Sequence, residues 1–399
     1  MVRPNQPGSS RDEHVKITNQ RKQGFLERLG ETTGGMLVGV LIFIFSFYLL
    51  FTNEGRCVRT QNSLNEGLSL VVSLSDVFTP LPQNDGKLVH LTGSLMTLQP
   101  LYDPNYGISV HVVKLQRRVE MYQWVEYSDS RDYEENGEKK IETRYSYNTE
   151  WKSEVVNSRS FDREIGHKNP SSMPVEAFTA VASDVNVGNF HFSKGLVDKV
   201  NTFKRIQLAK FEGPHSDIVV SDDYFYHSSN PRHPEVGDLR VSFYYAGLSG
   251  EWSFMGRPDV VTVVARQRGD QLLPYHTQSG NVLELLYEES LSATEVFERE
   301  HAANSMLTWG LRFAGWMLMF LGMKLMTKIF HTIVDWVPII RDLVSLGLTV
   351  FAACVATSLT LLTVALGWLF YRPLLALLLG CFSLVPILIV KSRDRPKML

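Results

Sequence analysis

One stretch near the N-terminus is almost wholly apolar: Met36-Leu-Val-Gly-Val-Leu-Ile-Phe-Ile-Phe-Ser-Phe-Tyr-Leu-Leu-Phe51. No charged residue lies between Glu31 and Glu54. A helix needs about 20 such residues to cross about 30 Å of hydrocarbon, so the stretch predicts a membrane span over residues 32–53. It begins past residue 30 and lacks a small-residue cleavage site. We therefore interpret it as a retained signal-anchor, with a cleaved leader as the alternative.

The C-terminal third contains three more apolar segments. Residues 305–327 are interrupted by Arg312 and Lys324, whereas residues 343–371 and 373–390 carry no charge. Each segment is long enough to cross a bilayer. Segment 343–371 is longer than one crossing needs, so its first turns are expected in the membrane interface. Arg312 and Lys324 lie near the ends of their segment, where long side chains reach water.

The four spans enclose a polar domain, residues 54–304. The predicted fold class is a membrane protein with four transmembrane α-helices and a large β-rich (α+β) lumenal domain between the first and second helices. The net charge of -2, without a long basic stripe, argues against a nucleic-acid partner. Cys57, Cys354 and Cys381 lie at or inside predicted spans. A disulfide scaffold or cysteine-based zinc site in the domain is therefore excluded.

Basic residues predict the orientation. They gather in the N-terminal tail, residues 1–31, in the connection between the second and third spans, and in the C-terminal tail, residues 391–399. The connection between the third and fourth spans has Arg372 alone. Because basic residues favour the cytoplasmic side, both termini are expected in the cytoplasm or nucleoplasm and the large domain in the lumen or perinuclear space.

The connection over residues 328–342 has an amphipathic pattern. Its apolar residues share one helical face: Ile329, Ile333, Val337 and Ile340. This pattern predicts a helix lying along the cytoplasmic membrane surface. A plain loop is the alternative, because Pro338 interrupts the segment.

The clearest local pattern in the domain is a long hairpin. Apolar residues alternate with polar ones from Val113 to Val125, although Arg117 and Gln123 break the apolar face. The alternation resumes from Ile141 to Trp151, beyond a turn at Asn136-Gly137. Alternation on both sides of Asn-Gly is the strongest short-range hairpin pattern.

Further strands are predicted at 86–93, 238–246 and 259–266, and we expect the last two to pair with each other. Ser292-Ala-Thr-Glu295 is a capping box that predicts a helix start. That helix can run straight on into the second span.

No nucleophile, metal or nucleotide-binding motif is present in the sequence. One suggestive cluster is Asp162, Glu164 and His167, which could form an acid/base or metal group. We favour the simpler interpretation of a turn with a structural histidine, because no second ligand cluster lies nearby. We expect no enzyme activity, no cofactor and no bound metal.

Small and hydroxyl residues recur in the spans at helix-packing spacing: Gly35, Gly39, Ala352, Ala356, Thr357, Ser358, Ala376 and Gly380. Small residues let helices approach closely, and hydroxyls can hydrogen-bond across the contact. Their pattern favours a tightly packed bundle or a homo-oligomer.

Several long stretches resemble the transmembrane protein 43 family, also called the LUMA family. They are Met121-Tyr-Gln-Trp-Val-Glu126, Thr143-Arg-Tyr-Ser-Tyr-Asn-Thr-Glu-Trp151, Phe161-Asp-Arg-Glu-Ile-Gly-His-Lys-Asn-Pro170, Pro234-Glu-Val-Gly-Asp-Leu-Arg-Val-Ser-Phe243, Ala265-Arg-Gln-Arg-Gly-Asp-Gln-Leu272 and Ala356-Thr-Ser-Leu-Thr-Leu-Leu-Thr-Val-Ala365. The resemblance implies a multi-span protein of the inner nuclear membrane and endoplasmic reticulum. Family members associate with emerin and lamins, self-associate and have no established catalytic activity. In the human member, a change at the serine matching Ser358 is linked to inherited arrhythmogenic cardiomyopathy.

The residues and the resemblance together predict a non-enzymatic scaffold that organises nuclear-envelope complexes. A lipid-binding or membrane-organising module is the alternative, followed by a lumenal hydrolase and a channel. For Ser358 we hypothesise a buried hydrogen bond at a helix contact, against the alternative of a bond to its own helix backbone.

Overall fold

A computed structural model describes residues 12–20, 25–135, 138–210, 218–250, 255–334 and 338–374. The chain divides into two compact units. The β unit comprises Met1–Lys22, Val72–Pro274 and Glu284–Leu291, and the helical unit comprises Gln23–Val71, Tyr275–Leu283 and Ser292–Leu399. Each unit is described by itself.

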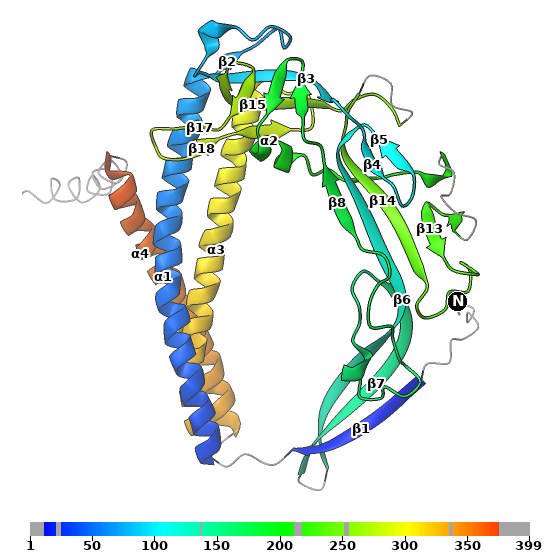
Figure 1. The fold of residues 1–399 in the computed structure, drawn as a ribbon. Coiled ribbons are helices and arrows are strands. Elements are labelled where there is room, and N and C mark those ends of the chain that lie inside the picture. The colour runs from blue at the N-terminus through cyan, green and yellow to red at the C-terminus, as the bar shows by residue number, and fades with distance from the viewer. Residues whose placement is uncertain are drawn as a thin grey trace, which may run out of the picture. The chain divides into compact units, whose positions relative to one another are not determined.

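Three long helices make up most of the helical unit (Figure 1): α1, Phe25–Leu70; α3, Ala293–Val334; and α4, Pro338–Tyr371. Their apolar parts are candidate membrane spans over Gly34–Leu70, Ala293–Lys328 and Leu346–Tyr371. The predicted fourth span, 373–390, lies almost entirely outside the described residues, which end at 374. A helix of 46 residues such as α1 is about 69 Å long, so it exceeds the hydrocarbon thickness of about 30 Å. Residues 54–70, expected in the β-rich domain, are helical as the continuation of α1.

The predicted capping box forms at the start of α3. The Ser292 backbone N–H donates to Glu295 Oε2 at 2.8 Å, and the Glu295 N–H donates to Ser292 Oγ at 3.3 Å. The helix then continues without a break through the second apolar segment to Val334. Both the helix start and its continuation into the span are confirmed.

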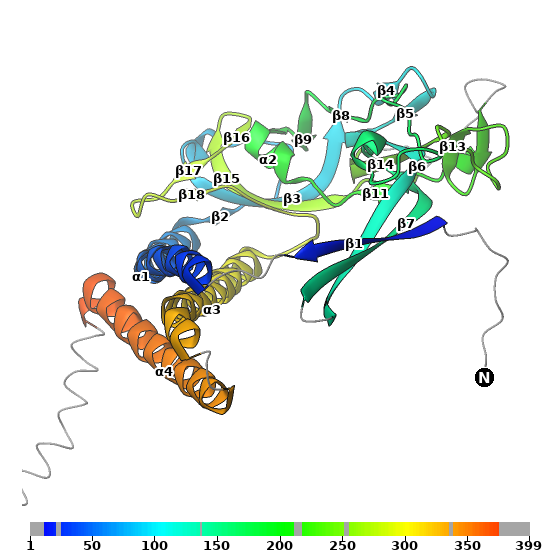
Figure 2. The same cartoon turned by 90° about the horizontal axis from the view of Figure 1, so that it is seen from below.

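Helices α1 and α3 pack antiparallel, and α4 lies beside them (Figure 2). A Cβ built on Gly39 would lie 2.8 Å from Leu325 Cβ, and one built on Gly315 would lie 2.6 Å from Leu50 Cγ. Glycines at these two points therefore let the helices approach closely. Leu50, Met319 and Ala356, one from each helix, form the buried core between them.

The predicted surface helix is divided between two helices. Ile329 and Ile333 belong to the last turns of α3, and Ile340 belongs to the first turn of α4. Val337 lies outside the described residues. A separate helix along the membrane surface stays a prediction.

Two sheets form the β unit. The 8-stranded sheet has the order β1-β7-β6-β14-β13-β12, and in addition β8 pairs with β6 and β11 pairs with β14. The 7-stranded sheet has the order β19-β15-β16-β10-β9-β3-β2, and in addition β15 pairs with β3. The strands of the first sheet are β1 Asp12–Gln20, β6 Val112–Glu135, β7 Glu138–Lys152, β8 Phe178–Val181, β11 Lys204–Arg205, β12 Val219–Ser221, β13 Tyr224–His227 and β14 Leu239–Leu248. Those of the second are β2 Val72–Ser73, β3 Leu88–Thr97, β9 Val185–Val187, β10 Phe190–Phe192, β15 Val260–Arg268, β16 Gln271–Leu273 and β19 Leu285–Tyr287.

Shorter elements complete the fold. They are the pair β4 Leu101–Asp103 and β5 Ile108–Val110, the pair β17 Tyr275–His276 and β18 Val282–Leu283, and the helix α2 Lys194–Lys199. The β unit has two apolar cores. One core centres on Val89, Phe190 and Val263, and the other on Tyr106 and Phe243. Burial raises the pKa of Tyr106 to about 12.

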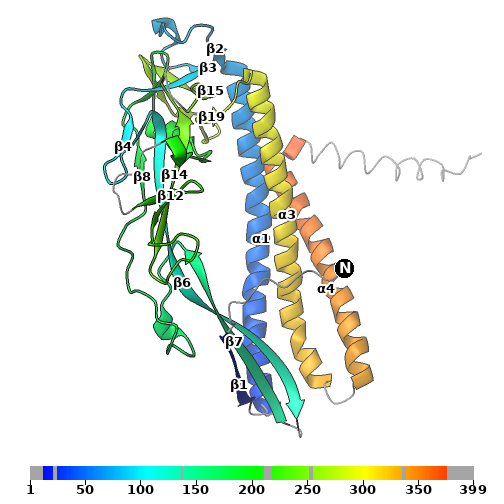
Figure 3. The same cartoon turned by 90° about the vertical axis from the view of Figure 1, so that its right-hand side faces the viewer.

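The predicted hairpin is confirmed as β6 and β7, which pair antiparallel from Met121 opposite Lys152 to Glu135 opposite Glu138 (Figure 3). Its turn, residues 136–137, lies outside the described residues. The register places Trp151 opposite Tyr122, and directly opposite residues share a face of the sheet. Met121, the next residue of β6, therefore points to the other face, so the apolar set of β6 that includes Met121 and the apolar set of β7 occupy opposite faces.

The expected pairing of the strands near 238–246 and 259–266 is wrong. Both strands exist, as β14 and β15, but β14 pairs with β6, β13 and β11, whereas β15 pairs with β3, β16 and β19. The physical reason is that both strands are buried over most of their length, so each needs neighbours on both edges within its own sheet. The strand near 86–93, β3, is central in the second sheet.

Strand β1 comes from the N-terminal tail and covers the outer edge of β7, with Asp12 opposite Tyr147 and Gln20 opposite Lys139. Segments joined in one sheet lie on the same side of a membrane, because a bilayer cannot separate paired strands. The predicted orientation places the tail and the domain on opposite sides. The pairing and a single crossing by α1 therefore exclude each other within one chain.

Arg117, which breaks the apolar pattern of β6, is buried with a partner. Its Nη1 lies 2.9 Å from Oδ2 of the fully buried Asp103, and its Nε donates to the Glu176 carbonyl at 2.9 Å. The guanidinium also lies 4.5 Å from the centre of the Phe178 ring. Gln123 is buried too, and it bonds the backbone at Glu154 and Val156.

We expect Asp103→Ala to destabilise the β unit by about 3–5 kcal/mol, because it leaves the Arg117 charge buried without a partner. Thermal unfolding of the detergent-purified full chain measures this. The control is Asp129→Ala, which breaks an exposed pair with Arg131 and is expected to change little. Equal effects of the two substitutions would contradict a structural role of the buried pair.

Candidate functional site

A buried ion pair joins α1 and α3 in the helical unit. Glu54 is only 1% exposed, and its two carboxylate oxygens accept hydrogen bonds from Arg312 Nε at 2.7 Å and Nη2 at 2.8 Å. Trp368 of α4 donates its indole N–H to Glu54 Oε2 at 2.9 Å. The contact needs Gly367, where a Cβ would lie 2.9 Å from Glu54 Cγ. One carboxylate therefore connects all three described long helices.

Aromatic rings enclose the Arg312 charge. The guanidinium carbon lies 4.7 Å from the centre of the Trp309 ring and 5.9 Å from that of Trp368. Arginine over an indole face gains a cation–π attraction that strengthens where water is excluded. The rings and the bidentate carboxylate together hold the charge in one geometry.

A second polar layer lies next to this pair. Arg56 donates to Asn304 Oδ1 at 2.9 Å and to Thr308 Oγ1 at 2.9 Å, and Asn53 Nδ2 donates to the Thr308 carbonyl at 3.1 Å. Arg372 donates to Gln61 Oε1 at 2.8 Å, which ties the end of α4 to α1. These fixed partners set the register of the helices. We call both layers together the helix network.

The expectation that Arg312 reaches water is wrong, because its guanidinium is bound by Glu54. The sequence signal for this pair is that Glu54 is the first charge after one apolar segment and Arg312 lies inside another. Lys324, treated in the same way, is exposed and lies 5.8 Å from the centre of the Phe320 ring.

The residues predicted to pack helices lie in different settings. Gly39 lies at the close approach of α1 to α3, whereas a Cβ on Gly35 would meet nothing within 4 Å. Ala352 and Ala356 are fully buried. Ala376 and Gly380 lie outside the described residues.

The two hydroxyls next to Ala356 differ. Thr357 accepts the Trp316 indole N–H at 3.1 Å and donates to the Ala353 carbonyl at 2.8 Å. Ser358 is exposed, and within the described part of the chain it makes no hydrogen bond through its side chain. The described parts of α1 and α3 thus do not supply the helix contact hypothesised for Ser358, which stays a prediction.

The cluster of Asp162, Glu164 and His167 does not converge on one point. His167 is buried, with its ring stacked on Tyr147 at 3.9 Å and its Nδ1 3.0 Å from the Arg163 carbonyl. Asp162 instead binds Lys16 and His14 of β1, and these hydrogen bonds lower its pKa. No group of three metal-binding side chains occurs within the described ranges. The geometry therefore favours a turn with a structural histidine.

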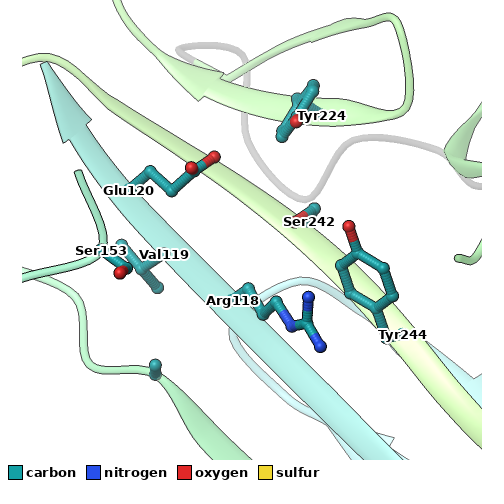
Figure 4. Close-up of a pocket in the computed structure, with 8 residues that line it drawn as sticks. Arg118, Val119, Glu120, Ser153, Tyr224, Ser242 and Tyr244 are labelled. Carbon is teal, nitrogen blue, oxygen red and sulfur yellow. The ribbon is translucent and has the colours of Figure 1, made fainter. Parts of the chain in front are cut away.

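The 8-stranded sheet has a pocket of about 420 Å³ on one face (Figure 4). It is lined by Arg118, Val119, Glu120, Ser153, Ala177, Tyr224, Ser242 and Tyr244. No sequence pattern predicted this pocket, because its residues come from β6, β13, β14 and two connections that only the sheet order brings together.

Comparisons with known proteins identify a family. Residues 121–373 match the family model described as transmembrane protein 43. Transmembrane protein 43 of Mus musculus is 61% identical, and that of Homo sapiens 60% identical, over 98% of this chain and 98% of each relative. A transmembrane protein 43 homolog of Drosophila melanogaster is 34% identical over 85% of this chain and 89% of the relative. No solved structure matches the chain.

We expect Glu54→Ala and Arg312→Met each to destabilise the helical unit by about 3–5 kcal/mol, because each leaves the other charge buried alone. The double variant Glu54→Leu/Arg312→Met should be more stable than either single variant, because it removes both charges. Thermal unfolding of the detergent-purified full chain measures all three, with Lys324→Met as the exposed control. Additive losses in the double variant would show that the two charges do not depend on each other.

Proposed function

Because this chain belongs to the transmembrane protein 43 family, we propose that it is a non-enzymatic scaffold of the inner nuclear membrane and endoplasmic reticulum. The observation that carries the proposal is the helix network. Within it Glu54 and Arg312 are bound to each other, and Glu54 also accepts the Trp368 indole N–H, so this pair serves helix–helix cohesion. An anchor of this kind holds one membrane position while other surfaces recruit partners.

The partners follow from the family resemblance. We propose that the chain associates with itself, with emerin and with lamins, and thereby organises nuclear-envelope complexes. The exposed Ser358 supports self-association, because a hydroxyl on an apolar helix is left to bond either its own helix or another one.

The orientation belongs to the same proposal. The basic tail stays in the cytoplasm or nucleoplasm and the β-rich domain lies in the lumen, as the charge distribution predicts. Since this arrangement excludes the pairing of β1 with β7, strand β1 must leave the edge of β7 when α1 crosses the membrane. The ion pairs of Asp162 with His14 and Lys16 are then lost, a small cost for such exposed contacts.

A lipid-binding or membrane-organising module is the second candidate. The pocket on the 8-stranded sheet favours it, because polar and cationic side chains gather there. A scaffold should co-purify with envelope proteins, whereas a lipid module should retain phospholipid or sterol through purification.

Glycosylation acceptors test the orientation. The chain has no acceptor of its own, since Asn169-Pro170-Ser171 is blocked by its proline. Glu138→Thr makes Asn136 an acceptor in the domain, and Arg21→Thr makes Asn19 one in the tail. We expect an endoglycosidase-sensitive mass shift for Glu138→Thr and none for Arg21→Thr, with Asn136→Gln/Glu138→Thr as the unmodified control. Modification of both positions, or of neither, would place tail and domain on one side and contradict the release of β1.

Purification from cross-linked cells tests the scaffold. The tagged full chain should recover an untagged copy, emerin and lamins, and Glu54→Ala should reduce this recovery severalfold because the anchor loosens. The control Lys324→Met changes a charge in the same apolar segment as Arg312 and leaves the helix network intact. It should recover these proteins as the wild type does. Recovery of lipid without any envelope protein would favour the second candidate and contradict the scaffold.

A further inference from the structure

The floor of the sheet pocket is the hydroxyl of Ser242. This residue lies in the middle of β14, opposite Arg118 of β6, and is only 3% exposed. Figure 4 shows it at the centre of the site, with Tyr224 and Tyr244 on either side. Among the described residues no hydrogen bond satisfies its hydroxyl, yet it lines the pocket. A pocket-lining hydroxyl without a protein partner leaves a donor and an acceptor for a ligand.

One wall carries a cation with free donors. Arg118 has its guanidinium 4.0 Å from the centre of the Tyr244 ring, which orients it. Its Nε donates to Gln116 Oε1 at 2.7 Å, and within the described residues no carboxylate lies within 4 Å of it. The two terminal nitrogens therefore remain available to an anion in a fixed planar arrangement.

Two further arginines, which do not line the pocket themselves, contact the ring of its lining residue Tyr224. Arg205 and Arg240 lie 4.0 Å and 4.5 Å from the centre of the Tyr224 ring. Arg240 Nε donates a hydrogen bond to Glu120 Oε2 at 2.7 Å. Burial acts to lower the pKa of Arg240, but the Glu120 carboxylate raises it above its usual value. Arg205 donates to the backbone carbonyls of Asp222 and Asp223, so no described carboxylate compensates its charge. Of the two charged side chains that line the pocket, Glu120 is bound to Arg240, which leaves Arg118 without a carboxylate partner among the described residues.

We propose that this pocket binds a phosphate monoester. A phosphate carries a charge near -2 at neutral pH and accepts hydrogen bonds from several directions. The donors here also come from several directions, namely Arg118 from one strand, Ser242 from the floor and the two tyrosine hydroxyls from the sides. A planar carboxylate would use the guanidinium fork alone. Phosphate monoesters occur in lipids such as phosphatidic acid and in soluble sugar phosphates, and the pocket volume admits either headgroup.

Binding is measured by calorimetry on the detergent-purified full chain with four probes: inorganic phosphate, glucose 6-phosphate, dihexanoyl phosphatidic acid and acetate. We expect saturable binding of the phosphates and none of acetate at equal concentration. Glucose 6-phosphate binding more tightly than the short-chain lipid would assign a soluble source, and the reverse order a membrane source. Either order supports the site.

Variants locate the binding in the pocket. Arg118→Gln should weaken it about tenfold or more, and Ser242→Ala about threefold or more, because each removes donors to the anion. Arg131→Gln removes an exposed arginine farther along the same strand and should leave binding unchanged. Because Arg118 is exposed, its variant is expected to fold, which the thermal unfolding temperature checks. No saturable binding, equal binding of acetate, or equal losses in Arg118→Gln and Arg131→Gln would overturn the proposal. The scaffold function does not depend on the result.

Discussion

A carboxylate and a guanidinium are tolerated between apolar helices only while they are paired, and the helical unit is arranged around that constraint. Removing either charge from water costs several kcal/mol, and the attraction between them repays the cost only in good geometry. Here Arg312 binds both oxygens of Glu54, and the Trp368 indole occupies one of them as well. Any slide of α1, α3 or α4 along its neighbour would break one of these bonds. The pair thus selects one register, which apolar contacts alone specify less sharply.

Glycine makes this geometry possible. Gly39 and Gly315 let α1 and α3 approach at two points, and Gly367 leaves the space that the Glu54 side chain fills. Close backbone approach and a satisfied charge pair therefore depend on each other. The β unit uses the same device, where Asp103 holds Arg117 inside an otherwise apolar sheet face. In each unit one charged residue that interrupts an apolar pattern, Arg312 or Arg117, has a buried carboxylate partner, whereas Lys324 is exposed.

Local patterns were predictable from the sequence, and long-range partners were not. The hairpin and the capping box at Ser292 follow from alternation and from side chains that bond the nearby backbone. The partners of β14 and β15 do not, because a buried strand is compatible with any matching neighbour. Glu54 and Arg312 are separated by most of the chain, so no local spacing connects them. The sheet pocket was even less predictable, because Ser242 and its other lining residues come from several strands far apart in the sequence.

The edge of β7 sets a last physical requirement. If β1 leaves when α1 enters the bilayer, β7 exposes a row of unpaired backbone groups, which is a template for association with other chains. The outer half of β7 carries alternating charges at Lys140, Glu142 and Arg144. Charged side chains along an edge oppose uncontrolled pairing, because a second strand would have to match their signs. In the register, however, Val15 lies opposite Arg144, Ile17 opposite Glu142 and Asn19 opposite Lys140, so β1 offers no opposite charge at these positions. Its ion pairs, from His14 and Lys16, go to Asp162 outside the strand. No directly opposite charge at these three positions therefore opposes the departure of β1 that a single crossing by α1 requires.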